Sequence, residues 1–218
     1  VGMFWTEDYM WGFHVLHKMW YFILFFPILF NIVKKKYIVH YISAFLFAIS
    51  LTEVLSYLVW FELIPPIKNA TVENPTPFMS HISYNPILTV AIYLVLYQIF
   101  FNTNLNKLRF FMYSFFAISM TINMFITGGR AGQIMFFSML AILIFQFFEK
   151  SKFKSLLGIL LIIPIIFITA YQASPLFEKR VNLAFHEALT FEVEKVTKVS
   201  SVGMRINYAL NSWHIIKE

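Results

Sequence analysis

Residues 110–148 read FFMYSFFAISMTINMFITGGRAGQIMFFSMLAILIFQFF. Two apolar runs, at about 110–127 and 133–148, stand on either side of a short turn-like stretch that contains three glycines and Arg130. Each run approaches the roughly 20 residues that an α-helix needs to cross the hydrocarbon core of a bilayer. The stretch therefore predicts two membrane-spanning helices joined by a tight turn at GGRAG.

The rest of the chain repeats this pattern. Of its 218 residues, 59% are hydrophobic and 13% are charged, whereas a soluble domain carries roughly 25% charged residues. Further apolar runs lie at about 14–33, 37–61, 86–101 and 155–173, and Pro164 should kink the last of them. We expect an all-α, polytopic transmembrane helical bundle of about six spans within residues 1–173. Because no cysteine is present, disulfides and thiolate metal sites are excluded.

The basic residues indicate the orientation of the bundle. Three short loops, KKK at 34–36, NTNLNKLR at 102–109 and EKSKFK at 149–154, together carry eight lysines and arginines. Loops rich in these residues stay in the cytoplasm. Residues 62–85, GGRAG and 174–218 are then expected outside, in the periplasm if the cell is Gram-negative. The net charge of +6 reflects this topology and does not indicate a nucleic-acid partner.

The outer tail, 174–218, is predicted to form two short amphipathic helices joined by VTKVSSVG. Apolar residues recur at helical spacing in each: Phe177, Val181, Ala184, Ala188 and Phe191 in the first, and Ile206, Ala209, Leu210, Trp213 and Ile216 in the second. The helices should lie on the membrane surface or cap the bundle. The chain does not begin with Met and ends at IIKE within an expected helix, so we expect a fragment that lacks its C-terminal part.

Two arginines are candidates for chemistry. Arg130 lies at the outer membrane edge, beside glycines that allow close approach and a helix start that favours anions. Its planar guanidinium suits phosphate oxygens. The alternative is that Arg130 extends to lipid headgroups. Arg205 could share a polar helix face with Tyr208 and Ser212, or it could be an ordinary surface arginine.

Two other residues have ionisable side chains in notable places. Glu53 lies in the middle of the second span, where a carboxylate should not face lipid. It is expected to pair with a cation or to hydrogen-bond a neighbour, with a structural role between helices favoured over a catalytic one. His81, on the outer side, could contact a ligand or accept a proton, although a local hydrogen bond is the simpler interpretation.

Several signals of other activities are missing from the sequence. It contains no GxxxxGK[ST], HExxH or GxSxG pattern and no carboxylate cluster for a divalent metal. We therefore expect no metal and no cofactor. A transporter is weakly supported, because a single buried carboxylate makes a thin ion pathway and no inverted repeat is evident.

The TGGRAG stretch, the later SSVGMRINYALNSWHIIKE, and the segments LTEVLSYL and PFMSHISYNP together resemble the O-antigen ligase family. This family belongs to a larger group with O-antigen polymerases and protein O-oligosaccharyltransferases. The resemblance implies a GT-C-type, metal-independent glycosyltransferase of the bacterial inner membrane with a periplasmic active site. It would move a glycan from undecaprenyl diphosphate to lipid A–core, in contact with membrane lipids.

The resemblance also implies roles for residues. Arg130 and Arg205 would hold the diphosphate and act in catalysis, and we add His81 as a candidate substrate-binding residue. The family's proposed base is a histidine after the second amphipathic helix, a role that we do not give to His214. A polymerase, a protein O-oligosaccharyltransferase, and a non-enzymatic transporter or sensor domain are the alternatives.

Overall fold

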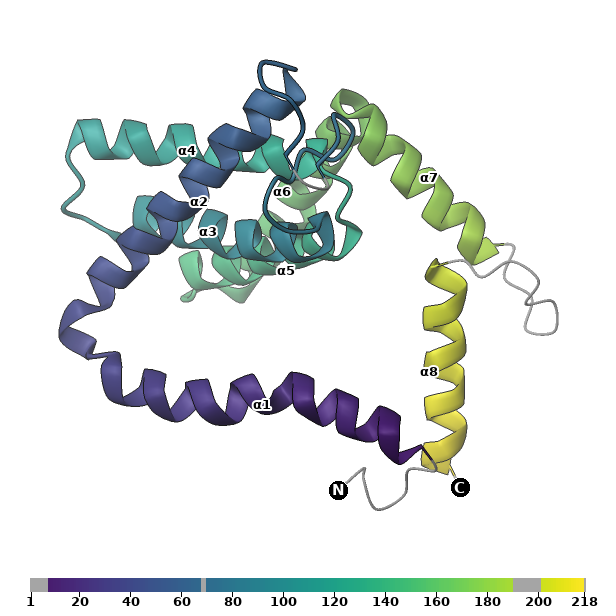
Figure 1. Cartoon of the computed structure of the whole chain (residues 1–218). Helices are drawn as coiled ribbons and strands as arrows, with labels where there is room; N and C mark the ends of the chain where they lie inside the picture. The colour runs from purple at the N-terminus through teal and green to yellow at the C-terminus, as the bar shows by residue number, and fades with distance from the viewer. Residues whose placement is uncertain (1–7, 68–69, 190–200, 218) are drawn as a thin grey trace. The chain divides into compact units, whose positions relative to one another are not determined.

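The computed structural model describes residues 8–67, 70–189 and 201–217 (Figure 1). Its helices are α1 (Tyr9–Ile32), a short 3-10 helix (Lys35–Tyr37), α2 (Ile38–Trp60), α3 (His81–Phe101), α4 (Lys107–Ile126), α5 (Arg130–Phe147), α6 (Lys152–Ala173), α7 (Pro175–Leu189) and α8 (Ser201–Lys217). No strand occurs among these residues. The first six α-helices are long and apolar enough to cross a membrane. The predicted all-α class with six spans is confirmed, and the chain is a multi-pass membrane protein.

The chain divides into two compact units, residues 1–47 and 48–218. The first unit contains α1, whose described residues are almost all exposed to the surroundings. Asp8 begins this helix, because its side chain accepts a hydrogen bond of 2.9 Å from the backbone N–H of Trp11. The three lysines 34–36 lie just after α1, and the last two of them begin the short 3-10 helix.

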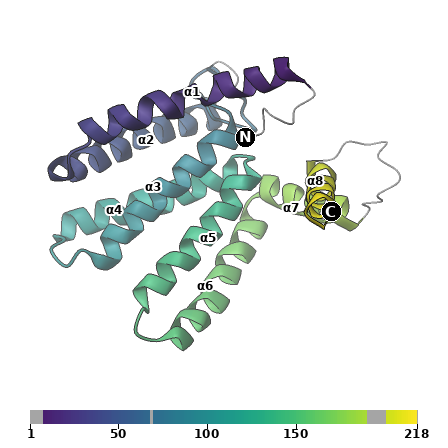
Figure 2. The same ribbon diagram turned by 90° about the horizontal axis from the view of Figure 1, so that it is seen from below.

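The second unit is built around α3, which packs against α4 and α5 and carries the largest set of buried residues. Figure 2 shows α3 to α6 as an antiparallel set. The α3–α4 and α5–α6 connections lie at one end, and the α4–α5 turn and the α6–α7 junction lie at the other. The second end holds the GGRAG stretch. Four helices therefore place this stretch at one end of the bundle.

The start of α3 differs from the prediction. Hydropathy begins the span at Pro86, but the helix begins five residues earlier at His81, and Pro86 lies inside it. The first turn is too polar to score as a membrane segment. Two of its residues, Tyr84 and Asn85, are nevertheless fully buried. Their side chains face protein, so the polar turn can remain helical at the bundle's outer end.

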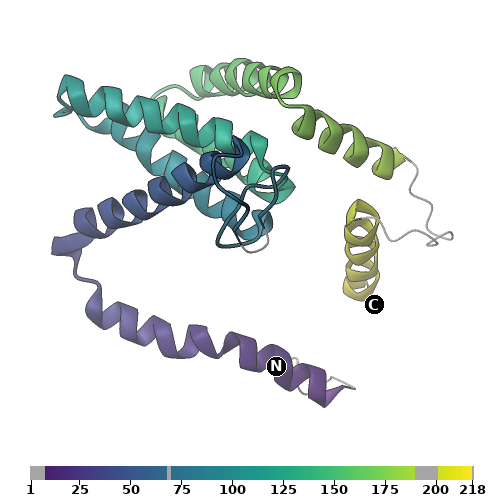
Figure 3. The same ribbon diagram turned by 45° about the horizontal axis from the view of Figure 1, so that its top comes forward.

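A bend at Ser174 turns the chain from α6 into α7 (Figure 3). Ser174 has extended backbone angles, and its Oγ donates a hydrogen bond of 2.7 Å to the backbone oxygen of Phe125 on α4. Pro175 then occupies the first position of α7, where its missing N–H is harmless. The bend lays α7 against α4 and α6.

The apolar stripe predicted for the first tail helix is the side of α7 that meets the bundle. Phe177 is buried and its ring lies 5.0 Å from that of Phe125 and 5.4 Å from that of Phe167. Val181, Ala184 and Ala188 continue this side of the helix and line a pocket there. Phe191, the last predicted member, lies outside the described residues.

Candidate anion-binding pocket at the turn between α4 and α5

The turn between α4 and α5 is held by buried amide and hydroxyl groups. Thr127 leaves the helix with extended backbone angles, and its Oγ1 donates a hydrogen bond of 2.7 Å to Oδ1 of Asn85 on α3. The Oδ1 atom of Asn74 accepts a hydrogen bond of 3.0 Å from the backbone N–H of Gly128. These contacts fix the turn to α3 and to the preceding loop, and so fix where α5 begins.

The glycines of the turn permit close packing. A Cβ atom on Gly129 would lie 2.5 Å from Nδ2 of Asn85 and 2.6 Å from the backbone oxygen of His81. A Cβ atom on Gly132 would overlap the Cβ of Asn85 and lie 2.6 Å from its carbonyl carbon. All of these distances are too short for non-bonded atoms, so a side chain at either glycine would force α3 and α5 apart.

Arg130 is the first residue of α5, and its side chain is 20% exposed. Its Nη1 lies 3.6 Å from Oε2 of Glu187 on α7, which is an ion pair but too long for a hydrogen bond. The Nε and Nη1 atoms are buried and have no hydrogen-bond partner. Leaving such donors unpaired costs roughly 1–3 kcal/mol or more each. The charge of Arg130 is compensated, but its hydrogen-bonding capacity is not.

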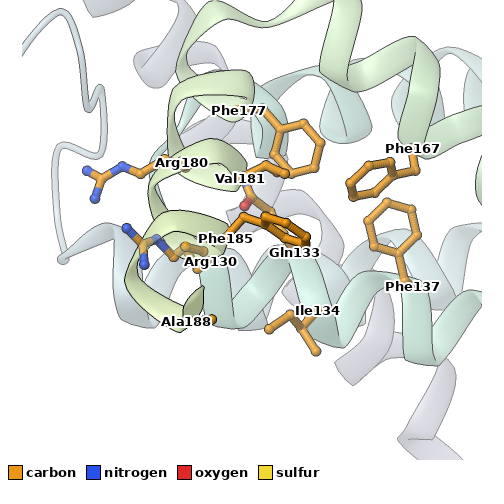
Figure 4. A pocket seen from close by; sticks show the side chains of 11 residues that line it. Arg130, Gln133, Ile134, Phe137, Phe167, Phe177, Arg180, Val181, Phe185 and Ala188 are labelled. Atoms are coloured by element: carbon orange, nitrogen blue, oxygen red, sulfur yellow. The ribbon is translucent and has the colours of Figure 1, made fainter. Parts of the chain in front are cut away.

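Arg180 on α7 is a second cation at this turn, and sequence reasoning missed it. Its Nη2 would lie 3.1 Å from a Cβ atom added to Gly128, so its guanidinium rests against the glycine backbone. Arg130 and Arg180 project toward the same side in Figure 4. The available signal was its spacing of three from Phe177 and four to Ala184, which places it at the edge of the apolar stripe.

The two arginines border a pocket of about 340 Å³ between α5, α6 and α7. Its remaining lining is mostly apolar: Ile134, Phe137, Phe167, Phe177, Val181, Ala184, Phe185 and Ala188, together with Gln133. In Figure 4 the rings of Phe137, Phe167 and Phe177 lie on the side away from the guanidinium groups. The pocket therefore has a cationic end and a hydrocarbon end, and suits a ligand that joins an anionic group to an apolar chain.

Gln133 connects the pocket to the turn. It is buried, and its Nε2 donates a hydrogen bond of 3.3 Å to the backbone oxygen of Thr127. This contact lies within the first turn of α5, next to Arg130. The side chain thus ties the start of α5 to the end of α4, and it makes the base from which Arg130 extends more rigid.

His81 is placed at the same end of the bundle. It is the first residue of α3, and its backbone oxygen lies against Gly129. It does not line the pocket described above. The structure thus puts His81 beside the candidate site, and its role in substrate binding stays a prediction.

Arg205 lies near the start of α8, and its side chain is exposed. It is not among the residues that line the pocket bordered by Arg130. The expected convergence of Arg130 and Arg205 on one ligand stays a prediction. The arginine that the structure does bring to Arg130's pocket is Arg180.

Glu53 was expected either to pair with a cation or to hydrogen-bond a neighbour, and the structure shows the hydrogen bond. Its side chain is 2% exposed, and its Oε1 accepts a hydrogen bond of 2.5 Å from Oγ of Ser119 on α4. The hydroxyl of Tyr57 donates to the backbone oxygen of Ser119 at 2.8 Å. One turn further along α4, Nδ2 of Asn123 donates to Oγ of Ser56 at 2.9 Å. Polar contacts therefore join α2 to α4.

Comparison with known proteins adds no family to this description. No protein-family model, curated protein or solved structure matches the chain. Within the described ranges, no group of three His, Cys, Asp or Glu residues could hold a metal ion.

Proposed function

We propose that the chain is an O-antigen ligase-like glycosyltransferase that takes a glycan from undecaprenyl diphosphate and joins it to lipid A–core at the periplasmic face of the inner membrane. The observation that carries the proposal is the pocket in which Arg130 and Arg180 border an aromatic, hydrocarbon-lined cavity. A polyprenyl diphosphate has the matching chemistry, with two charged phosphates joined to an apolar chain.

The unsatisfied donors of Arg130 support a phosphate ligand. A guanidinium holds its N–H donors in one rigid plane and binds phosphate oxygens through charge-assisted hydrogen bonds. Two of these donors in Arg130, Nε and Nη1, are buried without a hydrogen-bond partner. Their desolvation is offset once phosphate oxygens accept both hydrogen bonds.

In the proposed reaction, the acceptor hydroxyl oxygen attacks the anomeric carbon of the donor sugar. The bond from that carbon to the diphosphate oxygen breaks, and its electron pair stays on the leaving diphosphate. The hydroxyl proton passes to a general base, a role that the resemblance gives to a histidine after the second amphipathic helix. Arg130 and Arg180 stabilise the negative charge that develops on the leaving group. No metal or nucleotide is required, because the diphosphate bond already stores the energy.

Replacing Arg180 by Gln is expected to weaken the binding of undecaprenyl diphosphate by about tenfold, the effect of losing roughly 1.4 kcal/mol from a charged hydrogen bond. Binding is measured with the purified chain in nanodiscs of uncharged lipid. The matched control is Lys179→Gln, which removes the same charge from the adjacent, exposed position of α7. Equal affinity in both variants and the wild type would remove Arg180 from the site.

Deletion of the gene separates the proposed ligase from its alternatives. Loss of all long glycan from lipid A–core, seen on a lipopolysaccharide gel and restored by a plasmid copy, is the expected result. A single repeat unit that remains attached would instead indicate an O-antigen polymerase. Intact lipopolysaccharide with loss of glycan from proteins would indicate a protein O-oligosaccharyltransferase. No change in any glycan would favour a non-enzymatic transporter or sensor domain.

A further inference from the structure

An acidic residue, Glu187, lies beside the pocket and contacts one of its two arginines, although it does not line the cavity itself. Glu187 follows Arg180 by seven residues on α7, which is close to two full helical turns, so both side chains emerge on the same side of the helix. The Glu187 carboxylate reaches Arg130 on α5, with 3.6 Å between Oε2 and Nη1, and its side chain is 14% exposed. One helix thus supplies both a cation and an anion to the site.

The contact between Glu187 and Arg130 is a loose one. The carboxylate compensates the charge of the guanidinium, but at this distance it accepts no hydrogen bond from Nη1. A phosphate oxygen could do both. Glu187 therefore lies close to where a ligand oxygen would bind to Nη1, and its contact with Nη1 lacks the hydrogen bond that a phosphate would add.

We propose that Glu187 is a resident counterion that competes with the anionic ligand for Arg130, so that it lowers the affinity of the pocket more strongly for ligands of higher charge. This inference rests on the proposed function. Coulomb repulsion from one carboxylate grows in proportion to the charge of the ligand. A lipid diphosphate should therefore be disfavoured more than a lipid monophosphate.

The competition has a consequence for turnover. When the bond between the sugar and the diphosphate breaks, the terminal phosphate keeps the oxygen and gains an ionisable group. The leaving lipid diphosphate is therefore more negative than the donor from which it came. Repulsion by Glu187 acts more strongly on this product than on the donor, and helps the carboxylate to return to Arg130 as the product departs.

The test measures how tightly two probes bind to the purified chain in nanodiscs of uncharged lipid. The probes are undecaprenyl phosphate and undecaprenyl diphosphate. Glu187→Gln is expected to bind the diphosphate about tenfold more tightly than the wild type does, and to show a smaller gain for the monophosphate. The matched control is Glu178→Gln, an exposed position of α7 that lies nine residues earlier and so on the opposite side of the helix.

A second variant tests whether a changed affinity comes from misfolding of the first one. Glu187→Asp withdraws the carboxylate by one methylene but keeps its charge, and should give an intermediate gain in affinity. If the Gln and Asp variants bind the diphosphate no more tightly than the wild type, while Arg180→Gln weakens binding, competition by Glu187 is wrong and the proposed function stands. If neither the wild type nor Glu187→Gln binds either probe, the proposed function is wrong and this inference falls with it.

Discussion

Replacement of Arg130 by Lys is expected to reduce glycan transfer by about a hundredfold or more, although the positive charge is kept. The loss follows from geometry. A guanidinium offers several N–H donors in one rigid plane, whereas an ammonium is a point charge on a flexible chain. Removing one preorganised donor from an anion-stabilising site costs roughly 2.7–4 kcal/mol in the transition state, which is about 10²–10³ in rate.

The measurement is the restoration of long glycan on lipid A–core in the deletion strain, together with transfer by the purified chain. Arg109→Lys is the matched control, because Arg109 is exposed near the start of α4, at the opposite end of that helix from the GGRAG stretch. Full transfer by Arg130→Lys would contradict the phosphate-binding role. Arg130 would then be an anchor to lipid headgroups, the alternative considered from the sequence.

Gly132→Ala should greatly reduce the amount of folded protein, through packing rather than chemistry. The new methyl group would overlap the Cβ of Asn85 and lie 2.6 Å from its carbonyl carbon. Backbone atoms of a central helix cannot move aside as a side chain can, so α3 and α5 must separate. Overpacking of this kind typically costs about 1–3 kcal/mol and more where backbone is struck. Membrane yield and thermal unfolding in detergent, followed by tryptophan fluorescence, measure the effect.

Gly158→Ala is the control for this substitution. Its added methyl would meet Cγ2 of Ile144, a side-chain methyl group on α5, at 3.0 Å, and a shift of a few tenths of an ångström relieves that contact. The variant places the same methyl group in another membrane helix and should keep most of the stability. A Gly132→Ala protein as stable as Gly158→Ala would mean that α3 and α5 are not in such close contact.

The membrane spans could be predicted from sequence because hydropathy acts on each segment separately. Apolar runs of sufficient length become helices whatever their neighbours are. The start of α3 could not be predicted in the same way. Its polar first turn is helical because Tyr84 and Asn85 are buried against other helices. Burial by a partner is a property of the folded bundle, and no local pattern reports it.

Only part of the candidate site could be predicted, because the rest depends on contacts between distant segments. Arg130 drew attention because a charge beside two apolar runs is unusual in itself. Arg180 lies in a polar segment, where an arginine is unremarkable, and it reaches the pocket only because the chain bends at Ser174. Glu187 lies in the same polar segment, and its spacing along the helix does not say that a second helix supplies a cation to it. Side-chain pairs between distant segments depend on the fold.

Asn85 on α3 contacts three residues that lie far from it in the sequence, at and just after the end of α4. Its Oδ1 accepts from Thr127, its Nδ2 lies 3.4 Å from the oxygen of Gly129, and its backbone leaves no room beyond the hydrogen atoms of Gly132. As sequences diverge, exposed apolar positions such as Ile82 can be replaced by other apolar residues one at a time. Residues 85, 127 and 132 contact one another through Asn85, so a substitution at one of these positions requires a matching substitution at the others. Among distant homologues these three should vary together or not at all, and this shared constraint would mark common ancestry after overall identity has faded.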